Sequence, residues 1–230
     1  MFERPHHNAI AKILASIDGD LLAGAECYFG GGTAIVLALG EYRESVDIDF
    51  LCASQVGYRQ LRQATFGGTL HNLLKPGAEI RVLRDVRTDQ YGIRTQIGAG
   101  DARVKFEIVR EARIALSGAP DAALGVPVLA REDMYCEKLL ANADRYADRS
   151  VLNRDIIDLS MMMSRWGPVP DAAWAKARAA YGNTVESAFG KAVFAIRDPA
   201  WLKACMDGLA MDSHLADEVL HQHGGTRVSE

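Results

Sequence analysis

Two different periods of hydrophobic residues occur in the first 116 residues of the chain. Residues 8–17, 33–39 and 55–65 have apolar positions three and four apart, which is the spacing of a helix. Short apolar or alternating runs, typical of strands, occupy residues 26–29, 46–51, 79–85, 88–97 and 102–111. This mixture predicts an α/β (α+β) domain in which a mixed sheet is flanked by helices.

The second half of the chain has helical spacing almost throughout. Helical patterns cover residues 131–149, 153–166 and 171–181 and continue from residue 187 onward. Between the halves, residues 117–128 read SGAPDAALGVPV, a composition of Gly, Ala and Pro that predicts a connecting loop. We therefore expect an α/β domain over residues 1–118 and an all-helical C-terminal domain over residues 119–230.

The composition agrees with a globular chain of this kind. The 230 residues are 49% apolar and 24% charged, with a formal net charge of −4. That charge argues against sequence-blind binding of nucleic acid over the whole surface, but it allows a local basic patch. The four cysteines have no metal-binding spacing, and the sequence shows neither a signal peptide nor an apolar run of about 18 residues. We expect a cytoplasmic protein with reduced thiols and no membrane association.

The segment Val46-Asp47-Ile48-Asp49-Phe50 carries the first candidate chemistry. The period of two in a strand places Asp47 and Asp49 on one face and the three apolar residues on the other. Two adjacent carboxylates repel each other unless a cation bridges them, and hard oxygen ligands suit Mg²⁺, with Mn²⁺ as the alternative. A half-exposed strand without metal is the competing interpretation.

A glycine-rich turn precedes this strand. Gly31-Gly32-Thr33 leads from an apolar run into a helix that is expected to start near Ala34, with Thr33 in position to cap it. A helix N-terminus beside glycines is a natural phosphate site. The turn is no P-loop, because G-x-x-x-x-G-K-[ST] is missing, and no dinucleotide fingerprint, because Ile35 stands where a third glycine would be. A plain tight turn remains the alternative.

A third carboxylate has the same strand pattern. In Val104-Lys105-Phe106-Glu107-Ile108 the apolar residues alternate, so Glu107 points to the polar face. If this strand pairs beside the strand of Asp47 and Asp49, three carboxylates share one face and could hold a metal and help to deprotonate a hydroxyl. A solvated glutamate beside Lys105 is the equally weighted alternative.

Together, these residues resemble the AbiEii/AbiGii toxin type of nucleotidyltransferase, within the polymerase-beta-like nucleotidyltransferase superfamily. The resemblance rests on Gly31-Gly32-Thr33 followed by residues 43–50, RESVDIDF, which match the family string R-x-S-x-D-[IL]-D-[FL]. It implies a nucleotidyltransferase domain over residues 1–118, transferring a nucleoside monophosphate from a nucleoside triphosphate to a hydroxyl. It further implies metal binding by Asp47, Asp49 and Glu107 and nucleotide binding by Gly31, Gly32, Thr33, Arg43 and Ser45.

The helical half carries a second matching stretch. Glu137-Lys138-Leu139-Leu140-Ala141 is followed by Asp144-Arg145 and then by residues 154–159, RDIIDL, as in the C-terminal motifs of the family. The resemblance implies that Lys138 faces the nucleotide and that Asp155 and Asp158 are catalytic residues that orient Lys138 or Arg145. Without the resemblance, Asp155 and Asp158 would be interpreted as a surface salt-bridge pair one helical turn apart.

The acceptor and the partners follow from the resemblance alone. It implies an RNA acceptor, notably the 3′ end of tRNA, and a cognate antitoxin protein. Residues 81–113 contain eight Arg and Lys against five Asp and Glu, an excess of +3 that suits an RNA approach or a solvated face. Tyr42 stands where family members often have histidine, which puts an acceptor contact there in doubt.

Three alternatives to this function stay open. The same metal site could serve an enzyme that acts on a small molecule, such as an antibiotic hydroxyl, or on a protein side chain. A sugar-nucleotide glycosyltransferase also uses a D-x-D metal site, although it would not need the Gly-Gly-Thr turn. The third is a non-catalytic nucleotide-binding or partner-binding module.

Overall fold

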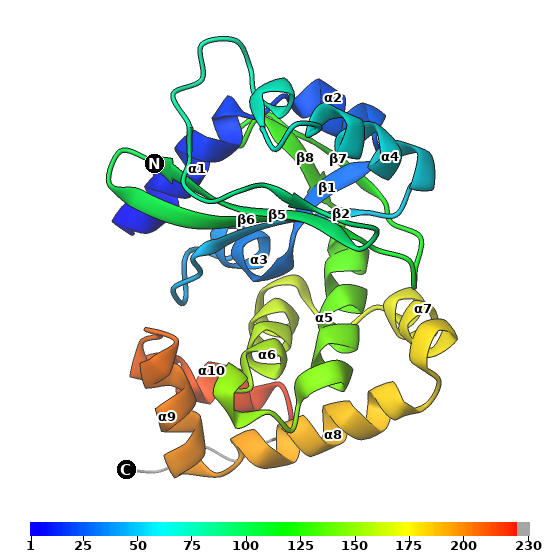
Figure 1. The fold of residues 1–230 in the computed structure, drawn as a ribbon. Coiled ribbons are helices and arrows are strands. Elements are labelled where there is room, and N and C mark those ends of the chain that lie inside the picture. The colour runs from blue at the N-terminus through cyan, green and yellow to red at the C-terminus, as the bar shows by residue number, and fades with distance from the viewer. Residues whose placement is uncertain (225–230) are drawn as a thin grey trace. The chain divides into compact units, whose positions relative to one another are not determined.

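The computed structural model describes residues 1–224, and the chain divides into two compact units (Figure 1). The sheet unit comprises Met1–Ala34 and Val46–Ala130. The helical unit comprises Ile35–Ser45 and the chain from Arg131 onward. The chain therefore enters the helical unit within one helix, after Ala34, and re-enters the sheet unit at Val46, just before the strand of Asp47 and Asp49.

The sheet unit is built on one mixed sheet, as the sequence predicts. Its strand order is β3-β5-β6-β2-β1-β8-β7, and β4 pairs with β5. The strands β1 and β2 are antiparallel, while β2 pairs with β6 and β1 with β8 in parallel. The strands are β1 (Cys27–Gly30), β2 (Asp47–Cys52), β3 (Arg81–Val82), β4 (Arg87–Thr88), β5 (Gly92–Ala99), β6 (Ala102–Arg110), β7 (Gly118–Asp121) and β8 (Val126–Leu129).

Helices account for most of the remaining described residues. The sheet unit contains α1 (Pro5–Ser16), α2 (Gly19–Gly24), the start of α3 (Gly31–Ala38), α4 (Gln55–Ala64) and η1 (His71–Leu73). The helical unit contains the rest of α3 with α5 (Arg131–Arg145), η2 (Arg149–Val151), α6 (Arg154–Trp166), α7 (Asp171–Tyr181), α8 (Thr184–Ile196), α9 (Pro199–Gly208), η3 (Ser213–Leu215) and α10 (Ala216–His221). This content confirms the predicted α/β half followed by a helical half.

One face of the sheet is apolar, which explains why apolar and polar residues alternate along its strands. Phe50 lies between Phe29 and Phe106, with ring centroids 5.7 and 5.9 Å apart. All three rings are buried, and the helices α1, α2 and α4 cover one face of the sheet (Figure 1). Burying each aromatic side chain stabilises the fold by roughly 1.5–3 kcal/mol. The opposite face of β2 is thereby left to its polar residues, Asp47 and Asp49.

The loop predicted over residues 117–128 is instead a β-hairpin. Residues of β7 pair with β8, and Val128 of β8 pairs with Phe29 of β1. Two prolines, Pro120 and Pro127, lie opposite each other in this hairpin; neither has an N–H to donate, and this composition masked the strands. The expected domain boundary at residues 118/119 thus falls at the start of the hairpin, while the sheet unit continues to Ala130.

One smaller expectation changes and another is confirmed. Of the strand predicted over residues 79–85, only Arg81–Val82 pairs, with β5. All four cysteines are buried and carry free thiols, as expected. No helix among residues 1–224 combines the length and the hydropathy needed to span a membrane.

Candidate active site

The polar face of the sheet carries a continuous row of charged side chains. Asp49 on β2 lies opposite Glu107 on the parallel strand β6, and Glu107 lies opposite Arg94 on β5. Arg94 in turn pairs in register with Arg87 on β4. A second row runs from Asp47 to Lys105 and Gln96. The predicted pairing of the two carboxylate-bearing strands is therefore confirmed.

The glycine turn lies directly against Asp49. Gly30 pairs in register with Asp49, and Gly31 adopts a left-handed φ of 68°. A Cβ atom on Gly31 would lie 2.9 Å from Oδ2 and 3.1 Å from the Cβ of Asp49. Glycine is thus required at position 31 both by the backbone conformation and by the close approach of the carboxylate.

Thr33 links the helix to the strand but does not begin the helix. The helix α3 starts at Gly31 rather than near Ala34, so Thr33 lies inside its first turn, with Gly32 half-buried before it. The buried Thr33 donates from Oγ1 to the carbonyl oxygen of Asp47 at 2.5 Å. The predicted N-cap position was wrong because both glycines join the helix. The contact nevertheless fixes the start of β2 against the helix N-terminus.

Both carboxylate oxygens of Glu107 are paired with cations. Oε1 accepts from Arg94 Nε at 2.5 Å, and Oε2 lies 2.7 Å from Lys105 Nζ. Burial raises the pKa of Glu107, but its contacts with Lys105 and Arg94 outweigh burial and hold the pKa below its usual range. Burial lowers the pKa of Lys105, but its bond to Glu107 and the charges of Glu107, Asp49 and Asp47 raise it above the ordinary value. Lys105 therefore offsets the charge of the whole carboxylate group.

The fit of a metal ion is better for the two aspartates than for Glu107. Among residues 1–224, no three His, Cys, Asp or Glu side chains are close enough together to hold a metal ion. The half-buried carboxylates of Asp47 and Asp49 offer the hard oxygen donors that Mg²⁺ prefers. Glu107 would first have to exchange its two cations, so its role as a third ligand stays a prediction.

A basic pocket of about 760 Å³ adjoins this face. It is lined by Arg84, Asp85, Arg87, Arg94, Thr95, Gln96 and Lys105. Four of these side chains are cationic and one is acidic, and the two that bind Glu107 are among them. We call it the arginine pocket. Its positive charge suits an anionic ligand, and Arg94 and Lys105 connect it to the carboxylate row. Part of the basic excess noted for residues 81–113 lies in this pocket.

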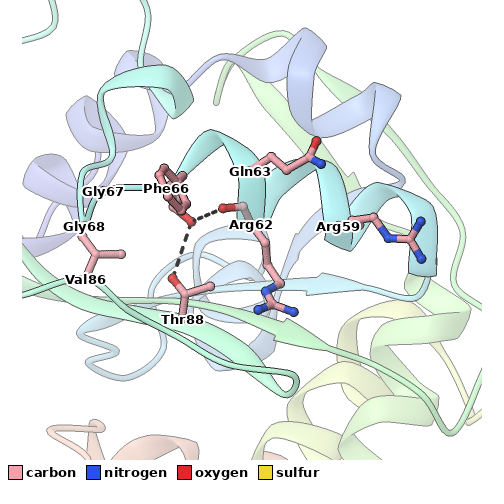
Figure 2. A pocket seen from close by; sticks show the side chains of 9 residues that line it. Arg59, Arg62, Gln63, Phe66, Gly67, Gly68, Val86 and Thr88 are labelled. Carbon is pink, nitrogen blue, oxygen red and sulfur yellow. Dashed lines mark hydrogen bonds between the residues drawn. The ribbon is translucent and has the colours of Figure 1, made fainter.

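Figure 2 shows a different pocket, of about 410 Å³, at the end of α4. Thr65 Oγ1 donates to the carbonyl of Arg62 and lies 3.5 Å from Thr88 Oγ1 (Figure 2). Val86 and Thr88 line this pocket, whereas Arg87 between them lines the arginine pocket. The other residues that line the pocket in Figure 2 belong to α4 and the segment after it, and α4 covers the opposite face of the sheet (Figure 1), so this pocket is not part of the carboxylate face.

The helical unit holds a second set of predicted residues in a buried charge network. Arg43 donates from Nε and Nη2 to the two oxygens of Asp158 at 2.7 and 2.9 Å. Lys138 Nζ lies 2.6 Å from Asp158 and 2.9 Å from Asp155. The hydroxyl of Tyr42 donates to Asp158 Oδ1 at 2.5 Å. These contacts join α5, α6 and the segment that precedes β2.

Asp155 completes this network. Arg145 donates to both of its oxygens, at 2.6 and 2.9 Å. Asp158, Asp155, Arg43 and Lys138 are all at most 5% exposed. The alternative of a surface salt-bridge pair is therefore wrong. The burial supports a positioning role, and direct contact of Lys138 or Arg43 with a nucleotide stays a prediction.

The two aspartates predict how stability depends on pH. Burial raises the pKa of Asp155, but Lys138 and Arg145 outweigh it and hold that pKa below the ordinary range. Burial likewise raises the pKa of Asp158, but Arg43 and Lys138 outweigh it and hold that pKa below the ordinary range. Groups with a depressed folded-state pKa stabilise the fold above their unfolded pKa of about 4, and this stabilisation is lost as the pH falls through the folded value. We expect the free energy of unfolding, measured with denaturant, to decrease as the pH is lowered below about 4. The decrease per pH unit should be smaller in Asp155→Asn, and equal decreases in the variant and the wild type would contradict this prediction.

Sequence reasoning missed several members of these clusters. Lys105 lies two residues from Glu107 on the same strand, where the period of two already places it, whereas Arg94 could be paired with Glu107 only once the register of β5 and β6 was known. No sequence signal links Arg43 to Asp158, 115 residues later. Tyr42, noted only as a departure from the family pattern, is a buried hydrogen-bond donor, and Ser45 lies half-buried between α3 and β2.

Comparisons with known proteins identify a family and proteins of similar fold. A family model described as Nucleotidyl transferase AbiEii toxin, Type IV TA system, matches residues 12–219. No curated protein matches the sequence. An antigenic nucleotidyltransferase-like protein from Paracoccidioides brasiliensis has a similar fold, with a TM-score of 0.50 and 14% identity over 89% of this chain and 95% of the other. A candidate nucleotidyltransferase from H. pylori matches with a TM-score of 0.49 and 18% identity over 94% and 91% of the two chains.

Proposed function

Because the chain belongs to the AbiEii nucleotidyl transferase toxin family, we propose that it transfers a nucleoside monophosphate from a nucleoside triphosphate to a hydroxyl of RNA, in the cytoplasm. The observation that carries this proposal is the placement of Asp47 and Asp49 against the glycine turn at the start of α3. The family also supports a nucleotidyl transfer activity over the sugar-transferring alternative. The toxin description in the family name supports a cognate antitoxin as partner.

The triphosphate is assigned to the turn at Gly31. The first turn of a helix presents peptide N–H groups and the positive end of the helix dipole, which favour phosphate. Gly31 lets the carboxylate of Asp49 approach this turn closely, while Thr33 ties the turn to the backbone of Asp47. When bound, Mg²⁺ or Mn²⁺ supplies positive charge to the phosphate oxygens, and Asp47 and Asp49 are the residues that would hold it.

The transfer balances as a single displacement. The acceptor oxygen forms a bond to the α-phosphorus, the bond from that phosphorus to the bridging oxygen breaks, and pyrophosphate leaves. We assign the acceptor proton to Asp49, because Glu107 is paired with two cations and its lowered pKa makes it a weak base. Glu107 instead positions Arg94 and Lys105, whose charges stabilise the phosphates.

The arginine pocket supports RNA over an uncharged small acceptor. Four of its lining side chains, Arg84, Arg87, Arg94 and Lys105, are cationic and one, Asp85, is acidic; Arg94 and Lys105 also bind Glu107. A phosphodiester backbone is an anionic ligand. The family context points to tRNA, and we propose its 3′ end as the acceptor.

The acceptor is tested by incubating the protein with Mg²⁺, total tRNA and each α-labelled nucleoside triphosphate in turn. We expect one nucleotide to label RNA on a denaturing gel, with the label removed by trimming the RNA from its 3′ end. Label on a small molecule or on protein, with unlabelled RNA, would replace RNA by that acceptor.

The glycine turn gives a prediction with a matched control. In Gly31→Ala the new methyl group strains the backbone and displaces Asp49, and a displacement on the order of 1 Å can lower a transfer rate about 100-fold. Gly67→Ala is the control, since Gly67 has a φ of 84° and no atom within 4 Å of the added Cβ. Backbone strain should cost both variants on the order of 1 kcal/mol in denaturant titrations, and Gly31→Ala should lose more because its new methyl group also clashes with Asp49. A wild-type transfer rate in Gly31→Ala would contradict the assignment.

A further inference from the structure

A pocket of about 590 Å³ in the helical unit lies outside all the residues assigned above. Three aromatic side chains line it: Tyr146 after α5, Phe194 on α8 and Trp201 on α9. Its volume falls in the range of about 300–1,000 Å³ typical of ligand sites. Phe194 is 78% exposed, so its ring offers a flat apolar surface to the solvent.

Cations alternate with these rings. The guanidinium of Arg149 lies 4.0 Å from the ring centroid of Trp201, and Lys191 Nζ lies 5.5 Å from that of Tyr146. Arg197 also lines the pocket, and all three cations belong to exposed residues. The one acidic residue, Asp198, accepts hydrogen bonds from the first backbone N–H groups of α9. The pocket is therefore a positively charged environment.

A single buried residue holds the ring of Trp201 and the backbone of Tyr146. Asn153 is 5% exposed and has a left-handed φ of 45°. Its Oδ1 accepts from Trp201 Nε1 at 2.7 Å, and its Nδ2 donates to the carbonyl of Tyr146 at 3.1 Å. Such strained backbone is retained where the surrounding structure holds it, and here Asn153 orients the Trp201 wall of the pocket.

We propose that this pocket binds unpaired nucleotides of the acceptor RNA, an inference that rests on the proposed function. An unpaired base has a free aromatic face to stack on Phe194, and its phosphates carry the charge that Arg149, Lys191 and Arg197 complement. A base inside a duplex is already stacked on both sides and cannot offer that face. The helical unit thus selects RNA that has a single-stranded stretch.

The test is a binding titration of the full chain without nucleoside triphosphate or metal. The probe is a fluorescent single-stranded oligoadenylate, and the comparison is a blunt-ended RNA duplex of two separate strands. We expect Phe194→Ala to weaken binding of the single strand roughly 5- to 150-fold and not that of the duplex. Phe194→Tyr should retain binding, and Lys191→Ala should lower the slope of log affinity against log salt by about 0.7.

The matched control is Lys203→Ala. Lys203 lies on α9 with a 72% exposed side chain paired to Asp207, and it does not line the pocket. It should leave the affinity unchanged. Wild-type affinity in both Phe194→Ala and Lys191→Ala, with their thermal unfolding midpoints unchanged, would overturn the proposal. The proposal would also be overturned if polyglutamate displaced the labelled oligoadenylate as well as unlabelled oligoadenylate does, because the pocket would then be assigned to an acidic peptide.

The two proposals fail in different ways. If the wild-type protein labels no RNA but Phe194→Ala still weakens single-strand binding, the pocket stands and the acceptor assignment fails. If RNA is labelled while Phe194→Ala and Lys191→Ala change neither the affinity nor the KM for RNA, the pocket proposal fails and the transfer activity stands.

Discussion

Asp49→Asn is expected to lower nucleotidyl transfer by at least about 100- to 1,000-fold, the cost of removing one preorganised electrostatic group from a catalytic site. Asp49 lies against Gly31 and beside Glu107. Its two proposed roles are to bind the metal ion and to accept the proton of the acceptor hydroxyl. The amide keeps the shape of the side chain but removes its charge and its basicity. Steady-state transfer of an α-labelled nucleotide measures the loss.

The fold should survive this change. Asp47 and Asp49 lie on one face of β2, so the removal of one charge relieves a repulsion. The thermal unfolding midpoint should therefore not fall. Asp101→Asn provides the control, because Asp101 is an exposed residue in the turn between β5 and β6 and should transfer at the wild-type rate. Full activity in Asp49→Asn would remove Asp49 from the mechanism.

Asp158→Ala is expected to destabilise the protein by roughly 3–5 kcal/mol, because it leaves buried charges without a partner. Asp158 is fully buried and binds Arg43, Lys138 and Tyr42. Its removal takes away the carboxylate that Arg43 binds, while Lys138 keeps its bond to Asp155. Denaturant unfolding at neutral pH measures the difference.

A surface pair supplies the comparison for this prediction. Lys203 and Asp207 form an exposed i,i+4 ion pair on α9, with side chains 72% and 59% exposed. Exposed pairs contribute about 0–1 kcal/mol, so Asp207→Ala should change the stability little. If Asp158→Ala were no more destabilising than Asp207→Ala, the network would not stabilise the helical unit.

Local alternation predicted much of the sheet and of the carboxylate face. The period of two in VDIDF and in VKFEI correctly separated Asp47, Asp49 and Glu107 from the aromatic core. It failed at residues 117–128, where Pro120 and Pro127 pair within a hairpin. In the interior strand β8, Val126 and Pro127 are adjacent and both buried, so the strand shows no apolar–polar alternation, and its proline is more typical of a loop.

Contacts between distant segments could not be predicted from spacing. Arg43 and Asp158 belong to elements 115 residues apart, and only their packing in one unit shows that both charges are buried. The aromatic pocket combines Tyr146, Phe194 and Trp201 from three separate elements. In each case the chemistry depends on tertiary packing, which a local period does not encode.

The most direct test of the central claim compares α-labelled and γ-labelled nucleoside triphosphate with Mg²⁺ and total tRNA. The wild-type protein should transfer the α-label to the acceptor and release the γ-label as pyrophosphate in equal amounts. Both products should disappear in the Asp47→Asn/Asp49→Asn double variant. Undiminished transfer in that variant, or release of inorganic phosphate without transfer by the wild type, would contradict nucleotidyl transfer on this carboxylate face.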